Sequence, residues 1–119
     1  MIRLVQCFEN NQEFDIDLIQ NLQKHVLDKN KKLSIDQLAK TLGTSRTQLH
    51  RKIKALTDMS VTNYINHIRI EKAKNLLVNT KLNSNEIAYE VGFESSTYFS
   101  RIFKKELGIS PIAFREKHV

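Results

Sequence analysis

The feature that most constrains the fold is an internal repeat. The segment LSIDQLAKTLG at 33–43 aligns with LNSNEIAYEVG at 82–92, 49 residues further along the chain. After the final glycine the offset becomes 50 residues, because the second turn holds one extra residue. The aligned pairs beyond the turn are Ser45 and Ser95, Leu49 and Phe99, Arg51 and Arg101, Ile53 and Phe103, Lys54 and Lys104, and Ser60 and Ser110. Two copies are too few for a solenoid, so the pattern predicts a duplicated supersecondary unit.

Each copy carries the signals of a helix, a tight turn and a second helix. A capping residue followed three positions later by Gln or Glu predicts a reciprocal capping box, and a glycine after the last apolar residue predicts the helix end. The capping pairs are Ser34 with Gln37 and Asn83 with Glu86, and the glycines are Gly43 and Gly92. The second helix is expected to begin at Ser45 in the first copy and near Ser95 in the other.

Three further helices are predicted outside these segments. Ser60 caps a long one that runs to about Val78, with an apolar stripe formed by Ile65, Ile68, Ala73, Leu76 and Leu77. An amphipathic helix follows Asp15, marked by Leu18, Ile19, Leu22 and Val26. Ser110 and Pro111 begin a short last helix toward Val119. The expected fold is therefore all-α and homeodomain-like, with about seven helices and no strand.

The same signals divide the chain into segments. Residues 1–13 have no periodicity and are expected to be a linker or tail. The first helix-turn-helix subdomain is predicted at 14–60, a linker helix at 61–79 and the second subdomain at 80–119. At about 1.5 Å per residue the linker helix spans roughly 27 Å. With the widths of the two units added, their recognition helices could reach successive major grooves of DNA, which lie about 34 Å apart.

Composition narrows the possible functions. The net charge of +6, from 19 Lys and Arg against 13 Asp and Glu, favours a polyanionic partner. Cys7 is the only cysteine, and the four histidines lack the spacing of a zinc site, so no disulfide, metal or cofactor is expected. Nothing resembles a nucleophile elbow or a phosphate-binding loop, which argues against an enzyme. Without a membrane-spanning run or a signal peptide, a cytoplasmic location is expected.

The second helix of each copy has two different faces. In the first copy Leu49, Ile53 and Leu56 form an apolar stripe, and the opposite face holds Thr47, His50, Arg51 and Lys54. In the second copy Phe99 and Phe103 point inward, and Thr97, Ser100, Arg101 and Lys104 point outward. No acidic residue occurs from Ser45 to Thr57. Arg can bond guanine O6 and N7 together, and hydroxyls reach base edges or phosphates, so these faces suit a DNA major groove.

The second unit resembles the C-terminal DNA-binding domain of the AraC/XylS family of transcription regulators. The matching residues are Ile87-Ala88, Val91-Gly92-Phe93, Tyr98-Phe99, Arg101, Phe103-Lys104-Lys105, Gly108, Ser110-Pro111 and Phe114-Arg115, with Tyr64-Ile65, Arg69-Ile70, Ala73 and Leu76-Leu77 in the linker helix. The likeness covers about 14–117. The first unit, SRTQLHRKIKALT at 45–57, is similar to the regulator end of hybrid two-component systems. This implies the output domain of a longer protein, joined to its preceding domain through 1–13, although a free-standing regulator stays open.

The resemblance also implies roles for individual residues. The positions that match base-reading residues are Thr47, His50 and Arg51 in the first unit, and Ser96, Thr97, Ser100 and Arg101 in the second. Phosphate contacts are expected from Ser34, Arg46, Lys52, Lys54, Ser84 and Lys104. The aromatic residues Phe93, Tyr98, Phe99, Phe103 and Phe114 are expected to pack in the core rather than stack on bases.

The expected partner is double-stranded DNA, at an asymmetric site of about two helical turns. RNA polymerase is a candidate second partner, no membrane contact is expected, and any dimerisation would belong to other domains of a longer protein. Two alternatives stay open: a helical protein-interaction module and a non-specific DNA-binding protein. Binding to unrelated duplex DNA that weakens with salt would exclude the first, and a strong preference for one site would exclude the second.

Overall fold

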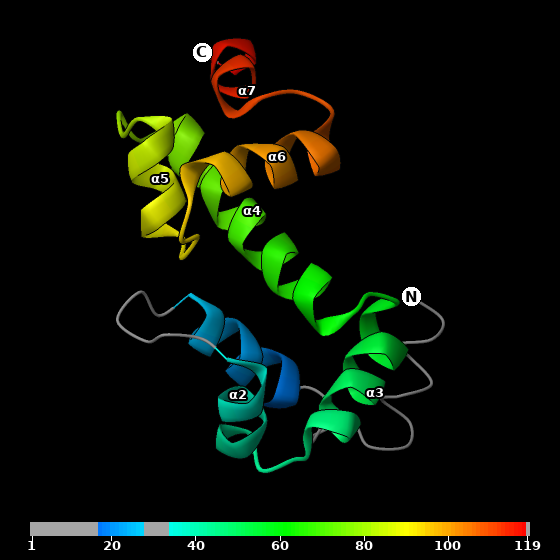
Figure 1. Ribbon diagram of the computed structural model, residues 1–119. Coiled ribbons are helices and arrows are strands. Elements are labelled where there is room, and N and C mark those ends of the chain that lie inside the picture. Colours follow the sequence, from blue (N-terminus) through cyan, green and yellow to red (C-terminus); the bar gives the residue numbers. More distant parts are fainter. Residues whose placement is uncertain (1–16, 28–33, 119) are drawn as a thin grey trace. The chain divides into compact units, whose positions relative to one another are not determined.

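The computed structural model describes residues 17–27 and 34–118 (Figure 1). Within them, all regular secondary structure is helical, which confirms the predicted all-α fold of seven helices. A helix over 17–26 is followed by α2 (Ile35–Thr41), α3 (Arg46–Thr57), α4 (Val61–Asn79), α5 (Ser84–Glu90), α6 (Ser96–Leu107) and α7 (Pro111–Lys117). The predicted tail at 1–13, the helix start at Asp15 and Cys7 lie outside the described residues.

The chain divides into two compact units, Met1–Ile65 and Asn66–Val119, and the division falls within α4. In the first unit α2 packs against α3; in the second α5 packs against α6, and α6 against α7. Each unit therefore contains one helix-turn-helix pair. The finer division, with 61–79 as a separate linker between subdomains 14–60 and 80–119, stays a prediction.

Serine and asparagine side chains begin the helices at the predicted places. In each case the side-chain oxygen of the capping residue accepts a hydrogen bond from the backbone N–H three residues later, which satisfies a donor that the helix leaves free. The caps are Ser34, Ser45, Ser60, Asn83, Ser95 and Ser110. At Asn83 the capping box is complete, because Glu86 Oε1 also accepts from the Asn83 backbone N–H at 2.9 Å.

The two helix-turn-helix turns have the same backbone hydrogen bonds. Gly43 and Gly92 follow α2 and α5 with φ of +71° and +104°, a conformation that residues with a side chain rarely adopt. The bonds run from Gly43 N to Lys40 O and from Thr44 N to Ala39 O, and correspondingly from Gly92 N to Tyr89 O and from Phe93 N to Ala88 O. These are the paired bonds of a Schellman motif. The predicted helix ends are confirmed, and Glu94 is the extra residue of the second turn.

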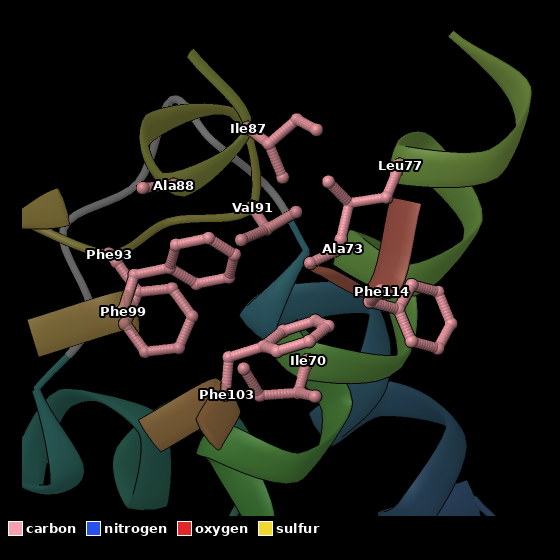
Figure 2. Packing of buried hydrophobic residues seen from close by; sticks show 10 residues of the cluster. All are labelled: Ile70, Ala73, Leu77, Ile87, Ala88, Val91, Phe93, Phe99, Phe103 and Phe114. Atoms are coloured by element: carbon pink, nitrogen blue, oxygen red, sulfur yellow. The ribbon is translucent and has the colours of Figure 1, made fainter. Parts of the chain in front are cut away.

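The core of the second unit is built around aromatic rings. Figure 2 shows the rings of Phe93, Phe99 and Phe103 directed toward the apolar side chains that α4 and α5 contribute. Neighbouring rings meet at tilted or edge-on angles, with centroids 5.3 Å apart for Phe93 and Phe99 and 5.7 Å apart for Phe99 and Phe103. Phe114 of α7 extends the series, 5.5 Å from Phe103. Four of the five aromatic residues predicted to lie in the core are buried.

The core of the first unit is mostly aliphatic instead. The buried residues include Leu49, Ile53 and Leu56 of α3, which confirms the predicted inward stripe. Among the described residues, the other members are Leu18, Leu22, Val26, Leu38, Ala39, Val61, Tyr64 and Ile65. Gln23 Nε2 donates to the Tyr64 hydroxyl at 3.4 Å, so the helix over 17–26 is joined to the start of α4. Each core therefore holds the back of α3 or α6 and leaves the opposite face exposed.

Arg115 closes the C-terminal end of α4. Its Nε donates to Leu77 O at 2.9 Å, and its Nη2 donates to Thr80 O at 3.1 Å. The last carbonyls of a helix have no partner within the helix, so the guanidinium supplies the missing donors from α7. This contact fixes α7 against the end of α4 within the second unit.

Candidate nucleic-acid interface

The exposed face of α3 carries the residues that the sequence assigned to base reading. Thr47 and Arg51 are exposed and His50 is half-buried. They lie at i, i+3 and i+4, so the helix places their side chains next to one another on the face opposite Leu49 and Ile53. Within the described part of the chain, Arg51 has no hydrogen-bond or ion-pair partner. Its guanidinium donors are therefore available to a base edge.

The equivalent face of α6 is also open to solvent. Thr97 and Arg101 are exposed, and Ser96 and Ser100 are half-buried. Among the described residues, Arg101 likewise has no hydrogen-bond or ion-pair partner. The residues differ from those of α3: two extra serine hydroxyls stand where α3 has Arg46 and His50. The two faces share a scaffold but present different donors and acceptors.

The first turns of both helices favour an anion. Neither α3 nor α6 has an acidic residue in its first turn. At the start of α6 the Ser95 hydroxyl accepts only the Tyr98 N–H, so the N–H groups of Ser96 and Thr97 have no intrahelical acceptor. These N–H groups and the positive end of the helix dipole are suited to a phosphate oxygen.

The residues predicted to contact phosphate are in different situations. Ser34 and Lys104 are exposed, Ser84 is the half-buried first residue of α5, and the Ser34 hydroxyl already caps α2. Arg46 Nη1 lies 3.5 Å from Asp36 Oδ1, and both side chains are mostly exposed. Such a surface ion pair is weak, so a phosphate can compete with Asp36 for Arg46.

The other two predicted phosphate residues are engaged within the chain. Lys54 Nζ donates to Asp58 O at 3.3 Å, just beyond the C-terminal end of α3. Lys52 is half-buried and also interacts with another residue. Asp58 has a positive φ of 62°, so the lysine contact lies at the left-handed residue that ends α3. For Lys52 and Lys54, a phosphate contact would require these contacts to be replaced or shared.

A polar group beneath α6 was not anticipated from the sequence. Asn66 of α4 is 6% exposed, and its Nδ2 donates to the Tyr98 hydroxyl at 3.0 Å. Tyr98 is 38% exposed, and its ring meets Phe93 edge-on with centroids 5.9 Å apart. The prediction that Tyr98 packs in the core therefore accounts for one side of the ring only. No periodicity distinguishes a buried asparagine on an apolar stripe, so the sequence held no signal for this bond.

Arg69 lies one turn from Asn66 on the same side of α4. Its guanidinium carbon is 5.7 Å from the centre of the Phe93 ring, and its Nε is buried without a hydrogen-bond acceptor. Burial lowers the pKa of Arg69, while the nearby Glu94 and Tyr98 act in the opposite direction. A cation over an aromatic face is stabilised by the ring quadrupole, which offsets part of the desolvation. The Arg69 side chain therefore lies directly against the backbone of the turn at Gly92.

The described residues hold neither a candidate metal site nor a candidate membrane span. No group of three or more His, Cys, Asp or Glu side chains there could hold a metal ion. No helix there is long and apolar enough to cross a membrane. The exposed polar faces of α3 and α6 occur at equivalent positions of the two units and form the candidate nucleic-acid interface.

Comparison with known proteins shows which family this helical domain belongs to. A profile of the helix-turn-helix domain matches residues 38–117, about two-thirds of the chain, from α2 to α7. The chain belongs to the AraC-type helix-turn-helix family. This AraC-type domain is a DNA-binding domain of transcription regulators, in agreement with the resemblance found in its sequence.

Three relatives illustrate the match. The C-terminal domain of AraT, a response regulator from Geobacillus stearothermophilus, is 36% identical with a TM-score of 0.78, covering 87% of this chain and 84% of that one. Histidine kinase P4 from Formosa agariphila is 36% identical over 89 residues, which are 75% of this chain and 6% of the kinase. The transcriptional activator RhaS from an Enterobacter strain is 33% identical over 113 residues, 95% of this chain and 40% of RhaS. The chain thus spans less than half the length of these two whole proteins.

Proposed function

We propose that this AraC-type domain reads an asymmetric DNA site as a monomer, through two half-sites of different sequence. The observation that carries the proposal is the pair of exposed faces at equivalent positions of α3 and α6. One face presents Thr47, His50 and Arg51, and the other presents Ser96, Thr97, Ser100 and Arg101. A symmetric dimer reads the same half-site twice, whereas two different faces in one chain favour two different half-sites in a fixed order.

In this proposal the arginines carry most of the base discrimination. Arg51 and Arg101 are exposed, lie at the same position of each unit, and have no partner among the described residues. An arginine fork can donate two hydrogen bonds to guanine, whereas the serine, threonine and histidine side chains offer single contacts. Phosphate contacts from Ser34, Arg46, Lys52, Lys54, Ser84 and Lys104 would set the register without specifying sequence.

We further propose that the domain is the output end of a longer two-component signalling protein in the bacterial cytoplasm. The likeness to a response-regulator domain and to a small part of a histidine kinase supports this context. Dimerisation then belongs to other domains, and RNA polymerase is a candidate protein partner. The matched relatives that regulate transcription favour a domain without enzymatic activity of its own.

Selection of bound sequences from a random duplex pool tests the proposal. We expect one non-palindromic site of about two turns, preferred over unrelated DNA by about 10³-fold or more. Arg51→Ala and Arg101→Ala should each weaken binding to that site by about 1–3 kcal/mol, and each should relax a different base position in a different half-site. Lys74→Ala is a charge-matched control, because Lys74 lies on α4 and pairs with Glu71 at 3.2 Å.

Three outcomes would contradict the proposal. Binding without site preference would indicate a non-specific DNA-binding protein. Affinity that is insensitive to salt would indicate a protein-interaction module, because phosphate contacts release counterions. Equal losses for both arginine variants on every sequence would make these residues phosphate contacts rather than base readers.

A further inference from the structure

Tyr98 packs against the aromatic core of the second unit, but unlike the phenylalanines of that core it is partly exposed. Phe93, Phe99 and Phe103 are each at most 3% exposed, whereas Tyr98 is 38% exposed. It is the third residue of α6, in the first turn of the helix that carries Arg101. Residues three apart are neighbours on a helix, so Tyr98 borders the reading face at Arg101. The exposed part of the ring is therefore next to the DNA-binding face.

The hydroxyl of Tyr98 is held by a buried donor. Asn66 Nδ2 donates to it at 3.0 Å, and the Asn66 side chain is almost wholly inside the protein. The Tyr98 ring also packs against the Phe93 ring at an interplanar angle of 63°, so both the ring and the hydroxyl of Tyr98 are held in place. A tyrosine oxygen that accepts a hydrogen bond still has its own proton to donate. Asn66 uses the Tyr98 oxygen as an acceptor, so the hydroxyl proton of Tyr98 is left to donate to an acceptor outside the protein core.

The surroundings of this hydroxyl suit an anionic acceptor. The exposed basic residues Arg101 and Lys105 follow Tyr98 at i+3 and i+7 on α6. A phosphate at this edge of the helix could accept from the Tyr98 hydroxyl with the Lys105 cation on the same helix, while Arg101 stays directed toward the bases.

We propose that Tyr98 donates a hydrogen bond from its hydroxyl to a DNA phosphate at the edge of the α6 reading face, and that Asn66 is the positioning residue for it. The proposal rests on the DNA binding of the domain and adds a contact to it. It assigns two roles beyond the predicted phosphate set: a neutral donor on α6 and a buried amide on α4. Because a phosphate carries no base identity, this contact adds affinity and register but no sequence preference.

The test compares Tyr98→Phe with the unchanged chain on the selected site and on an unrelated duplex. The variant keeps the ring and loses only the hydroxyl. We expect binding to weaken by about tenfold on both duplexes, the effect of removing a hydrogen bond to a charged group. The slope of affinity against salt should not change, because a neutral donor releases no counterion; a lost Lys or Arg contact would reduce it.

A scan with single neutral methylphosphonate linkages then locates the acceptor. One linkage should weaken the unchanged chain by about the same factor as Tyr98→Phe, and that linkage should cause little further loss in the variant. Asn66→Ala should weaken binding as well, and the double variant Asn66→Ala/Tyr98→Phe should bind no worse than Tyr98→Phe alone. Non-additivity of this kind identifies residues that act on one contact.

Tyr64→Phe is the matched control for stability. Its hydroxyl also accepts a side-chain hydrogen bond, from Gln23, but Tyr64 is only 8% exposed and cannot reach DNA. We expect Tyr64→Phe to bind normally, with urea unfolding reporting any loss of stability in all variants. If Tyr98→Phe unfolds the domain, the methylphosphonate scan is run instead with Asn66→Ala, in which the effect of the one sensitive linkage should be reduced.

The possible failures are distinguishable. Unchanged affinity of Tyr98→Phe, or a loss that no single linkage reproduces, overturns the inference and leaves the reading faces of α3 and α6 as proposed. A loss confined to one base pair makes Tyr98 a base contact and also overturns it. If the unchanged chain binds no duplex, both the inference and the proposed function fail.

Discussion

The two equivalent turns allow the cost of replacing a positive-φ glycine by alanine to be measured at two positions. At one of them no other side chain is near, and at the other the Arg69 side chain is close. Gly43 and Gly92 occupy equivalent positions after α2 and α5, both with positive φ. A Cβ placed on Gly43 would meet nothing within 4 Å. A Cβ placed on Gly92 would lie 3.1 Å from Arg69 Nε, closer than nearly all real Cβ contacts. Replacing each glycine by alanine therefore separates the strain of the backbone from the contact with Arg69.

The expected magnitudes follow from these two geometries. At Gly43, φ is +71°, close to the left-handed helical region, so Gly43→Ala should cost about 1 kcal/mol of unfolding free energy. At Gly92, φ is +104°, well outside that region, and the backbone strain alone should cost about 2 kcal/mol. Arg69 must also move, although its guanidinium lies over Phe93. We expect a total of about 3 kcal/mol for Gly92→Ala.

Urea unfolding followed by circular dichroism at the helical band measures these differences. If the two units unfold in separate transitions, the transition of the affected unit is compared with its counterpart in the unchanged chain. In an Arg69→Ala background the contact is absent, so the Gly92→Ala penalty should fall toward that of backbone strain alone. Gly43→Asn should be better tolerated than Gly43→Ala, because asparagine enters the left-handed region more easily.

Two results would refute this reasoning. Equal penalties at Gly43 and Gly92 would mean that neither the larger φ nor the approach of Arg69 has an energetic effect. A Gly92→Ala penalty that persists unchanged without the Arg69 side chain would assign the whole effect to the backbone.

Three further predictions concern caps and charge. Asn83→Ala should lower the unfolding free energy of the second unit by about 1 kcal/mol, since the Asn83 side chain caps α5 within a complete capping box; an unchanged urea midpoint would contradict it. Arg115→Ala should cost about 2 kcal/mol by releasing Leu77 O and Thr80 O, and Arg115→Lys should recover only part because lysine lacks the fork; full recovery would show that charge alone suffices. Lys104→Ala should weaken binding to all duplexes alike and reduce the salt slope by about 1, and a sequence-dependent loss in binding assays would instead assign Lys104 to a base.

Much of the fold could be read from the sequence because its signals are local. A serine or asparagine cap acts on the backbone three residues away, and a glycine after a helix acts on its own φ. These interactions depend on neighbours in the chain, so Ser45, Asn83 and Gly92 identify helix boundaries whatever surrounds them. The duplication supported the same helix boundaries a second time, because Ser95 aligns with Ser45 and Gly43 aligns with Gly92.

The exposure of the proposed base readers was also accessible from helical periodicity. Leu49 and Ile53 fixed the inward face of α3, so Thr47 and Arg51 had to point outward. Side-chain contacts between different helices could not be predicted from helical periodicity. Nothing local indicated that Asp36 pairs with Arg46, since this contact depends on how α2 and α3 pack against each other across the turn.

The repeat at 33–43 and 82–92 therefore determined one helix and its turn in each unit, and caps and periodicity along the rest of the sequence determined the other helices and the two outward faces. Only the tertiary structure decided which polar side chains of α4 lie beneath the second turn, and that Tyr98 has one side on Phe93 and its hydroxyl on Asn66. The physical reason is the sequence separation over which each interaction acts. Capping and periodicity act within one or two helical turns, whereas Asn66 and Tyr98 are 32 residues apart and meet only because the core of the second unit holds α4 against α6.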